Sequence, residues 1–153
     1  VKMQSIEEIL RAKKIKVTPQ RMAVYSVLKN TKSHPSVENI YQQLKPDYPA
    51  MSLATVYKTV DVFKKVGLIQ ELSIGDGGLR YDADMKPHSH IYCRGCGRIV
   101  DLQQNCFAGY FNGKILLKKI NEETGFDISS FQLYFYGLCP RCKKAKSYST
   151  TLE

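Results

Sequence analysis

The residues most able to do chemistry lie close together in the stretch from Lys86 to Asp101, which reads KPHSHIYCRGCGRIVD. This stretch contains two histidines, two cysteines and a closing aspartate. Imidazoles, thiolates and carboxylates are the side chains that bind transition metals in proteins. The stretch therefore belongs either to one metal site or to two sites with different roles.

Four of the five cysteines form two CxxC pairs, Cys93 with Cys96 and Cys139 with Cys142. Each pair supplies two neighbouring corners of a tetrahedron from one tight turn, and two pairs supply the four thiolates of a structural zinc site. Residues 97–138 separate the pairs, a longer spacing than in a compact zinc ribbon. We therefore predict a structural Zn(II) that fastens a distant C-terminal segment to the start of the second half.

Two other kinds of site also use paired cysteines. A thioredoxin-type redox dithiol usually has a single CxxC near a βαβ pattern. A zinc deaminase needs an HxE element for its general acid and base, and the HSH at residues 88–90 has no glutamate. The fifth cysteine, Cys106, lies outside both pairs, and we expect a small buried hydrophobe there rather than a ligand.

His88 and His90 are separated by one residue, so in a strand their imidazoles would face the same side. Because four thiolates already complete a tetrahedron, these histidines favour a second metal site. Asp82 and Asp101 are candidate carboxylate partners, and this donor set suits Fe(II), Mn(II) or Zn(II). The alternative is that both aspartates are ordinary exposed residues. The third histidine, His34, is distant in sequence, and pattern alone assigns it no role.

The first half of the chain is predicted to be helical, with a hairpin at its end. Thr18 and Pro19 are typical of a helix start, and Ser52 and Gly67 bound another helix. Apolar residues at helical spacing occur in SIEEILRAKK, KVTPQRMAVYSVLKN, HPSVENIYQQLK and SLATVYKTVDVFKKVG. LIQELSI and LRYDAD flank the turn sequence GDGG and predict a β-hairpin. Helices followed by a basic hairpin are typical of a winged helix-turn-helix.

From the apolar spacing we expect a buried face in the second and third helices at Met22, Val24, Val27, Leu28, Val37, Ile40, Tyr41 and Leu44.

The second half is predicted to be a small unit with strands and one helix. HIYC and GRIVDL are expected strands around the CRGC turn, and NGKILLKKINEETG is an expected helix that ends at Gly125. FDISSFQLYFYGLC alternates apolar with polar side chains and predicts a further strand. The expected fold class is α+β, with a winged-helix domain at 1–82, a hinge at 83–87 and a small α/β metal-binding domain at 88–153.

The net charge and the lengths of the apolar runs indicate which kinds of partner the chain can bind. The net charge of +9 and the pI of about 9.3 favour an acidic partner such as nucleic acid, although a basic surface can also serve solubility alone. No apolar run approaches the roughly 20 residues that span a bilayer, and the N-terminal VKMQSIEEIL is unlike a signal peptide. We expect a cytoplasmic protein with no membrane partner.

Five segments in order, KVTPQR, HPSVENIY, MSLATVYKTVDVF, HSHIYCRGCGRIVDL and YGLCPRC, resemble motifs of the Fur family of metal-dependent transcriptional repressors. The resemblance extends over essentially the whole chain and is strongest to the peroxide-sensing, PerR-like subgroup. It implies a protein that is not an enzyme, has no small organic substrate and binds double-stranded DNA as a homodimer on a two-fold symmetric operator. Residues 88–153 would form the dimerisation domain, with FQLYFYG and KILLKKI at the dimer surface.

The same resemblance implies a regulatory Fe(II) or Mn(II) held by five ligands, His34, Asp82, His88, His90 and Asp101. A metal bound by residues of both domains would bias their relative orientation. Iron-sensing relatives commonly have glutamate at the positions of Asp82 and Asp101, whereas PerR-like proteins have aspartate. The implied mechanism is iron-driven oxidation of His34 or His88 by peroxide, then loss of the metal and release of DNA. Manganese would support repression without this oxidation.

The chain departs from the family in two places. Many relatives have a histidine near the position of Phe131, where it contributes to another metal site, and we therefore predict no such site here. Cys106 matches no family position.

Expected DNA contacts come from the fourth helix and from the start of the second. Thr55, Tyr57 and Lys58 would face outward if Val56, Val60 and Phe63 face the core. The resemblance implies that Tyr57 and Lys58 enter the major groove, where a phenol ring could pack against a thymine methyl and an ammonium could donate to guanine. It further implies a minor-groove contact by Lys16 and a phosphate contact by Arg21. Lys64 and Lys65 are expected to form a solvated face.

Two alternative functions remain open. One is a Fur-like regulator of iron or other metal uptake, which belongs to the same class. The other is a metal-dependent redox enzyme that uses the three histidines, against which the winged-helix half and its basic bias count.

Overall fold

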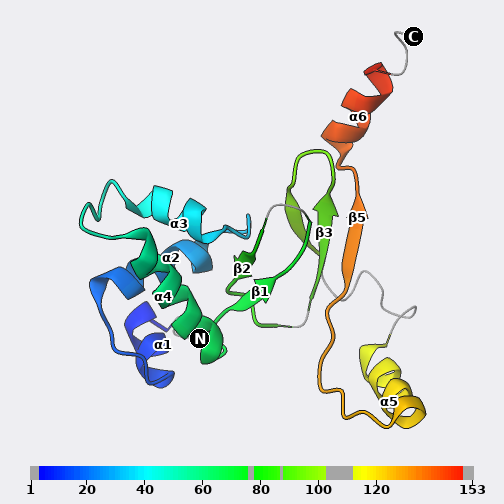
Figure 1. Cartoon of the computed structure of the whole chain (residues 1–153), viewed down its shortest axis with the longest axis horizontal. Helices are drawn as coiled ribbons and strands as arrows, with labels where there is room; N and C mark the ends of the chain where they lie inside the picture. Colours follow the sequence, from blue (N-terminus) through cyan, green and yellow to red (C-terminus); the bar gives the residue numbers. More distant parts are fainter. Residues whose placement is uncertain (1–3, 76–77, 87, 103–111, 150–153) are drawn as a thin grey trace. The chain divides into compact units, whose positions relative to one another are not determined.

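The protein divides into two compact units, residues 1–86 and residues 87–153 (Figure 1). The computed structural model describes residues 4–75, 78–86, 88–102 and 112–149. Cys106, Pro87 of the expected hinge and residues 76–77 of the expected hairpin turn lie outside the described residues. In the described part of the chain, no helix is both long enough and apolar enough to cross a membrane.

Among the described residues of the first unit, four helices precede a hairpin, and each of them begins at a hydroxyl cap. They are α1 (Ile6–Ala12), α2 (Pro19–Asn30), α3 (Val37–Leu44) and α4 (Leu53–Lys65). The hydroxyls of Ser5, Thr18, Ser36 and Ser52 each accept a hydrogen bond from the backbone N–H three residues later. The predicted caps at Thr18 and Ser52 are confirmed, and α3 begins directly after Ser36.

The core of the first unit is built from the apolar faces of these helices. Phe63 of α4 is fully buried and meets the ring of Tyr25 edge to face, with 5.8 Å between centroids. Val24, Val27, Leu28, Val37, Ile40 and Leu44 are buried as predicted. Met22 and Tyr41 are only partly buried, contrary to prediction, because they pack against the edge of this core rather than within it.

A two-stranded antiparallel sheet follows the helices. It pairs β1 (Gln70–Leu72) with β2 (Arg80–Asp82), and the register places Gln70 opposite Asp82. The backbone N–H of Tyr81 donates to the carbonyl of Pro35 at 3.1 Å and so joins the segment before α3 to β2. Helices followed by this hairpin give the predicted winged helix-turn-helix arrangement (Figure 1).

The second unit contains a small sheet, with α6 extending from one end of it and α5 beyond the other end (Figure 1). Its strands β3 (Ser89–Cys93), β4 (Ile99–Leu102) and β5 (Tyr134–Gly137) lie in the order β4-β3-β5. β3 runs antiparallel to β4 and parallel to β5. The helices are α5 (Gly113–Thr124), which ends at Gly125 with φ 72° as predicted, and α6 (Pro140–Ser149).

The strand predicted over FDISSFQLYFYGLC is much shorter in the structure, because only residues 134–137 pair with the sheet. At the start of this segment, the side chain of Asn121 of α5 accepts from the backbone N–H of Ile128 at 2.9 Å and donates to the carbonyl of Ile128 at 3.2 Å. Ile128 is thus held by the end of the helix instead of by a neighbouring strand.

Two residues after the end of α1, Lys14 has a backbone conformation that glycine usually adopts. Its φ is +55°, and the N–H groups of Lys14 and Ile15 close the helix on the carbonyls of Arg11 and Leu10, both at 2.9 Å. A side chain in the left-handed region costs about 1 kcal/mol or more, because Cβ crowds the following carbonyl.

We expect Lys14→Gly to raise the free energy of unfolding by about 1 kcal/mol, because it removes this crowding. Lys13 is the matched control, since it has φ −88° and gains nothing from glycine. Urea unfolding followed by far-ultraviolet circular dichroism measures both variants. A Lys14→Gly protein no more stable than the wild type would contradict the prediction.

Candidate metal centres

Four cysteine thiols meet in the second unit, at the junction of β3 and α6. Cys93 ends β3, Cys96 lies in the turn that leads to β4, and Cys139 and Cys142 flank the start of α6. All four sulfur atoms lie within 4.8 Å of one another. The structure therefore brings the two CxxC pairs together despite the residues between them.

The thiols in this cluster are not equivalent. The backbone N–H of Cys139 donates to Cys93 Sγ at 3.2 Å and lowers the pKa of the Cys93 thiol to about 6. A hydrogen bond with Cys139 raises the pKa of the Cys142 thiol to about 12. Four thiols this close cannot all lose their protons unless a cation compensates the charge. A divalent ion with a preference for sulfur, such as zinc, fits this donor set.

Gly95 lets the two CxxC turns approach each other. A Cβ at this position would lie 2.9 Å from Cys142 Cβ and 3.0 Å from Cys142 Sγ. Real Cβ atoms are essentially never that close to their neighbours. Any larger residue at position 95 would push the second pair away from the first.

Substitution of Gly95 by alanine is expected to weaken zinc binding at the four cysteines. The added methyl group would force Cys142 away from the first cysteine pair, so the four sulfur atoms could no longer converge on one ion. Gly137→Ala is the matched control, since a Cβ there meets nothing within 4 Å. Competition with a chromogenic zinc chelator measures the affinity. Equal zinc retention in both variants would contradict the prediction.

A second group of metal-binding side chains gathers at the other end of β3. His90 lies opposite Asp101 across the β3–β4 pair, and the rings of His88 and His90 are 4.5 Å apart. The Nε2 atoms of His88 and His90 lie 3.5 Å and 3.6 Å from the same oxygen, Asp101 Oδ1. Two imidazoles and one carboxylate in the second unit thus converge on a single point.

The first unit contains its own histidine–aspartate pair. His34 is 2% exposed, and its Nε2 lies 3.8 Å from Oδ2 of Asp82, which is also buried. His34 has φ +50°, and Arg80 Nη1 donates to its carbonyl at 3.4 Å. A buried residue other than glycine in this region stores backbone strain, which is characteristic of functional sites.

The sequence did not predict two residues, Gln70 and Asp84, that donate hydrogen bonds to the carboxylate of Asp82. Gln70 Nε2 donates to Asp82 Oδ2 at 3.0 Å and to the carbonyl of Asp84 at 2.9 Å. The backbone N–H of Asp84 donates to Asp82 Oδ1 at 2.8 Å. The hairpin pattern is the signal that could have identified Gln70, because the register pairs it directly with Asp82.

The outward face of α4 agrees only partly with the expected DNA contacts. Tyr57 is 47% exposed and Lys58 is exposed. Thr55 is only partly buried and not fully outward, because its hydroxyl lies 2.9 Å from that of Ser52 in the helix cap. The hydroxyl of Tyr57 donates to the carboxylate of Glu38 on α3, a contact that the sequence did not predict.

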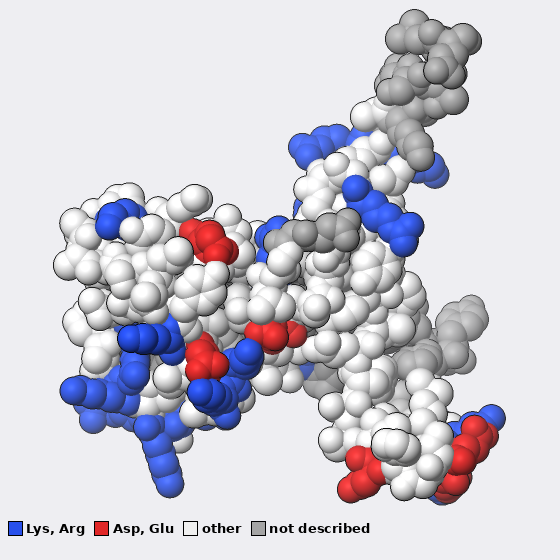
Figure 2. Space-filling view, viewed as in Figure 1, with Lys and Arg blue, Asp and Glu red and all other residues white. Residues whose placement is uncertain are grey.

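Basic side chains gather over α1 on the first unit (Figure 2). Lys16 is exposed, and Arg21 donates through Nη1 to the carbonyl of Lys16 at 2.9 Å. Lys64 and Lys65 form ion pairs of 2.7 Å with Glu71 and Asp61, respectively. Lys16 and Arg21 are thus joined locally, whereas the charges of Lys64 and Lys65 are partly balanced.

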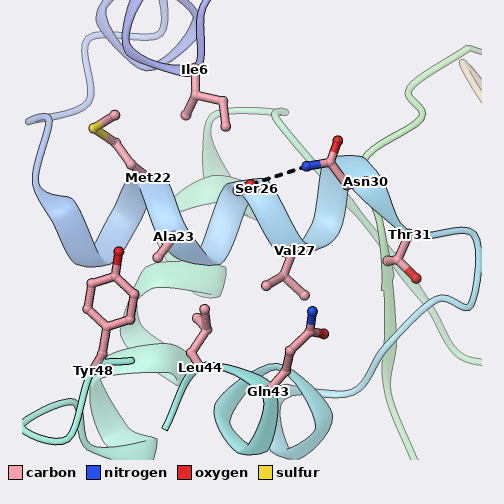
Figure 3. Close-up of a pocket in the computed structure, with 10 residues that line it drawn as sticks. All are labelled: Ile6, Met22, Ala23, Ser26, Val27, Asn30, Thr31, Gln43, Leu44 and Tyr48. Carbon is pink, nitrogen blue, oxygen red and sulfur yellow. Dashed lines mark hydrogen bonds between the residues drawn. The ribbon is translucent and has the colours of Figure 1, made fainter. Parts of the chain in front are cut away.

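An open pocket of about 570 Å³ lies beside α2 in the first unit (Figure 3). Of the residues described as lining it, none has an imidazole, thiol, carboxylate or cationic group. They are Ile6, Met22, Ala23, Ser26, Val27, Asn30, Thr31, Gln43, Leu44 and Tyr48. This pocket therefore offers no metal-binding chemistry.

Comparison with known proteins places these features in context. Residues 12–136 match the ferric uptake regulator family. The chain is 37% identical over 134 residues to the peroxide-responsive repressor PerR of Staphylococcus aureus. The aligned residues cover 88% of this chain and 86% of that protein. Its structure resembles that of the Campylobacter jejuni peroxide stress regulator, with a TM-score of 0.68, 29% identity, and coverage of 92% and 100% of the two chains. A zinc-bound manganese uptake regulator has a TM-score of 0.66 and 26% identity, over 89% of this chain and 99% of that one.

Proposed function

The chain belongs to the ferric uptake regulator family, and we propose that it is a metal-dependent, DNA-binding repressor of transcription that responds to peroxide. The observation that supports this most directly is the pair of histidine–aspartate groups, one in each unit. Family membership indicates a regulator rather than an enzyme. A cytoplasmic location follows from this role.

The two groups are proposed to form one regulatory site. His34 and Asp82 would come from the first unit, and His88, His90 and Asp101 from the second. Three imidazoles and two carboxylates suit Fe(II) or Mn(II), which take nitrogen and oxygen ligands. Residues 83–87 would then act as the hinge between a winged-helix domain at 1–82 and a dimerisation domain at 88–153.

The four cysteines have a different role in this proposal. Cys93, Cys96, Cys139 and Cys142 would hold a structural Zn(II), whose closed thiolate shell leaves no position for a substrate. Zinc is also inert to oxidation and reduction, so it would keep β3 and α6 together while the regulatory site changes. The solved manganese uptake regulator is zinc-bound, which supports zinc as a metal of this fold.

Peroxide sensing would depend on the imidazoles of His34 and His88. Bound iron(II) would supply the redox chemistry that makes peroxide an oxidant of a neighbouring side chain. One oxygen atom of peroxide would be added to an imidazole carbon and the other would leave as water. The modified ring would bind a metal less well, so the first unit would lose its connection to the second and DNA binding would fall.

DNA recognition is proposed for α4 and for the segment before α2. Tyr57 and Lys58 would reach base edges in the major groove, Thr55 would support them, Lys16 would enter the minor groove and Arg21 would contact phosphate. A dimer would place two such units on a two-fold symmetric operator.

The dimer surface is proposed to include α5 and β5. No residue of α5 is buried, and its Ile115 is 65% exposed. Phe126 after α5 is 72% exposed, and Phe135 and Tyr136 of β5 are also exposed. Apolar side chains in such numbers usually mark a surface that another protein covers.

The peroxide response can be tested on the zinc-loaded protein. After Fe(II) loading and a brief exposure to dilute peroxide, mass spectrometry should find one added oxygen on the peptide that contains His34 or on the one that contains His88. The same treatment with Mn(II) should leave both peptides unchanged. DNA affinity, measured by gel shift, should fall only in the iron-loaded sample.

Unmodified histidines with retained DNA binding would contradict peroxide sensing and favour a regulator of metal uptake. The similarity to a manganese uptake regulator is the observation that supports this second function. In that case DNA binding should follow the concentration of one metal and be insensitive to peroxide.

The contribution of α4 to DNA binding has its own test. Lys58→Ala is expected to weaken binding about tenfold, since a base contact contributes roughly 1–3 kcal/mol. Lys32→Ala is the matched control, because Lys32 is exposed in the same unit and lies outside the segments proposed to contact DNA or the partner subunit. Binding by the wild type should also weaken steeply with salt. A flat salt response, or equal binding by both variants, would contradict the DNA interface.

A further inference from the structure

Gln70 lies between the proposed metal ligand Asp82 and the start of the linker that follows it. We propose that Gln70 is a positioning residue, which orients the carboxylate of Asp82 for the regulatory metal and ties that carboxylate to the path of residues 82–86. This inference rests on the proposed function, because it assumes that Asp82 is a ligand. It concerns only residues of the first unit, whose contacts are described above.

The carboxamide of Gln70 uses both of its N–H groups in this arrangement. The strand register places Gln70 directly opposite Asp82, and Nε2 reaches Asp82 Oδ2 at 3.0 Å. The same nitrogen reaches the carbonyl of Asp84 at 2.9 Å. An NH₂ group has two hydrogens, so both bonds can exist together. Gln70 thus bridges a side chain and the backbone two residues later.

The segment after Asp82 has a defined local structure. Asp82 Oδ1 accepts from the N–H of Asp84 at 2.8 Å, and Asp84 Oδ1 accepts from the N–H of Lys86 at 3.0 Å. Each is an aspartate side chain that bonds the backbone two residues on, a common way to build a turn. Two such turns in succession, with Gln70 on the carbonyl of Asp84, fix the path from Asp82 to Lys86.

The two oxygens of Asp82 therefore have separate tasks. Oδ1 forms the turn, whereas Oδ2 accepts from Gln70 and is the oxygen that lies 3.8 Å from His34 Nε2. Hydrogen bonds to a carboxylate are charge-assisted and hold its plane in place. With both oxygens hydrogen-bonded, the Asp82 carboxylate is held in one orientation, with Oδ2 toward His34.

Metal binding and linker geometry are coupled through this one side chain. A cation that engages Asp82 favours the carboxylate orientation in which the turn at Asp84 also forms. By thermodynamic reciprocity, metal binding and formation of the turn then favour each other by the same factor. Gln70 contacts both parts and should strengthen both.

The test measures Mn(II) affinity of the zinc-loaded full chain, from the electron paramagnetic resonance signal of free manganese. Gln70→Met keeps the length of the side chain and removes the donor, whereas Gln70→Asn keeps a neutral amide donor on a shorter side chain. Gln42→Met, at an exposed position of α3, is the matched control. We expect Gln70→Met to weaken binding about 10- to 100-fold, the usual cost of removing a residue that orients a ligand. Gln70→Asn should recover part of the affinity, and Gln42→Met should bind as the wild type does.

Zinc content and thermal unfolding of each variant exclude a general loss of structure. Should Gln70→Met fail to fold, Gln70→Val provides a second donor-free side chain that suits a strand. Manganese binding by Gln70→Met equal to that of the wild type, or an equal loss of affinity in Gln42→Met, would overturn the inference.

Asp82→Ala separates the inference from the function on which it rests. If Asp82→Ala binds manganese weakly while Gln70→Met binds it as the wild type does, the positioning role of Gln70 is wrong and the regulatory site stands. If Asp82→Ala also binds manganese as the wild type does, Asp82 is not a ligand. The proposed role of Asp82 in the regulatory site and the positioning role of Gln70 are then both wrong.

Discussion

The structure depends on a constraint that a buried carboxylate beside a buried imidazole imposes. Such groups lose their hydration, and proteins keep them inside only where hydrogen bonds, opposite charge or a metal compensate. Asp82 beside His34 in the first unit is such a case, and Asp101, whose side chain is 21% exposed beside the buried rings of His88 and His90, is a less buried one in the second unit. The pair in the first unit supplies only two ligands, and the proposed single ion bound by both groups would use every histidine of the chain.

The remainder of each unit holds these groups in place. In the first unit, the core around Phe63 supports the hairpin, and the hairpin holds His34 through Arg80 and Asp82 through Gln70. In the second unit, the β3–β4 pair sets His90 opposite Asp101 at one end of β3, and the cysteine cluster occupies the other end. In the proposed mechanism, a structural thiolate site and an oxidation-sensitive site would lie at opposite ends of one strand, so oxidation at the second need not disturb the first.

The sequence predicted local structure well wherever one short pattern determined it. Thr18 and Ser52 were found as caps and Gly125 as a helix end, because each depends on a few neighbouring residues. The strand near Phe135 was predicted too long, and at the start of the predicted segment Ile128 bonds to Asn121 of α5 instead of to a strand. Gln70 and Glu38 were missed because their partners lie on other elements. His34 had no local signal, and only resemblance to a family suggested its role.

The most direct test of the central claim is the number of manganese ions bound per zinc-loaded chain when one histidine from each unit is removed in turn. The account predicts one tightly bound Mn(II) in the wild type, and loss of that same ion in both His34→Ala and His90→Ala, with zinc retained. Because the two histidines belong to different units, this result requires a shared site. Undiminished manganese binding by His34→Ala, with loss only in His90→Ala, would contradict it and confine the metal to the second unit.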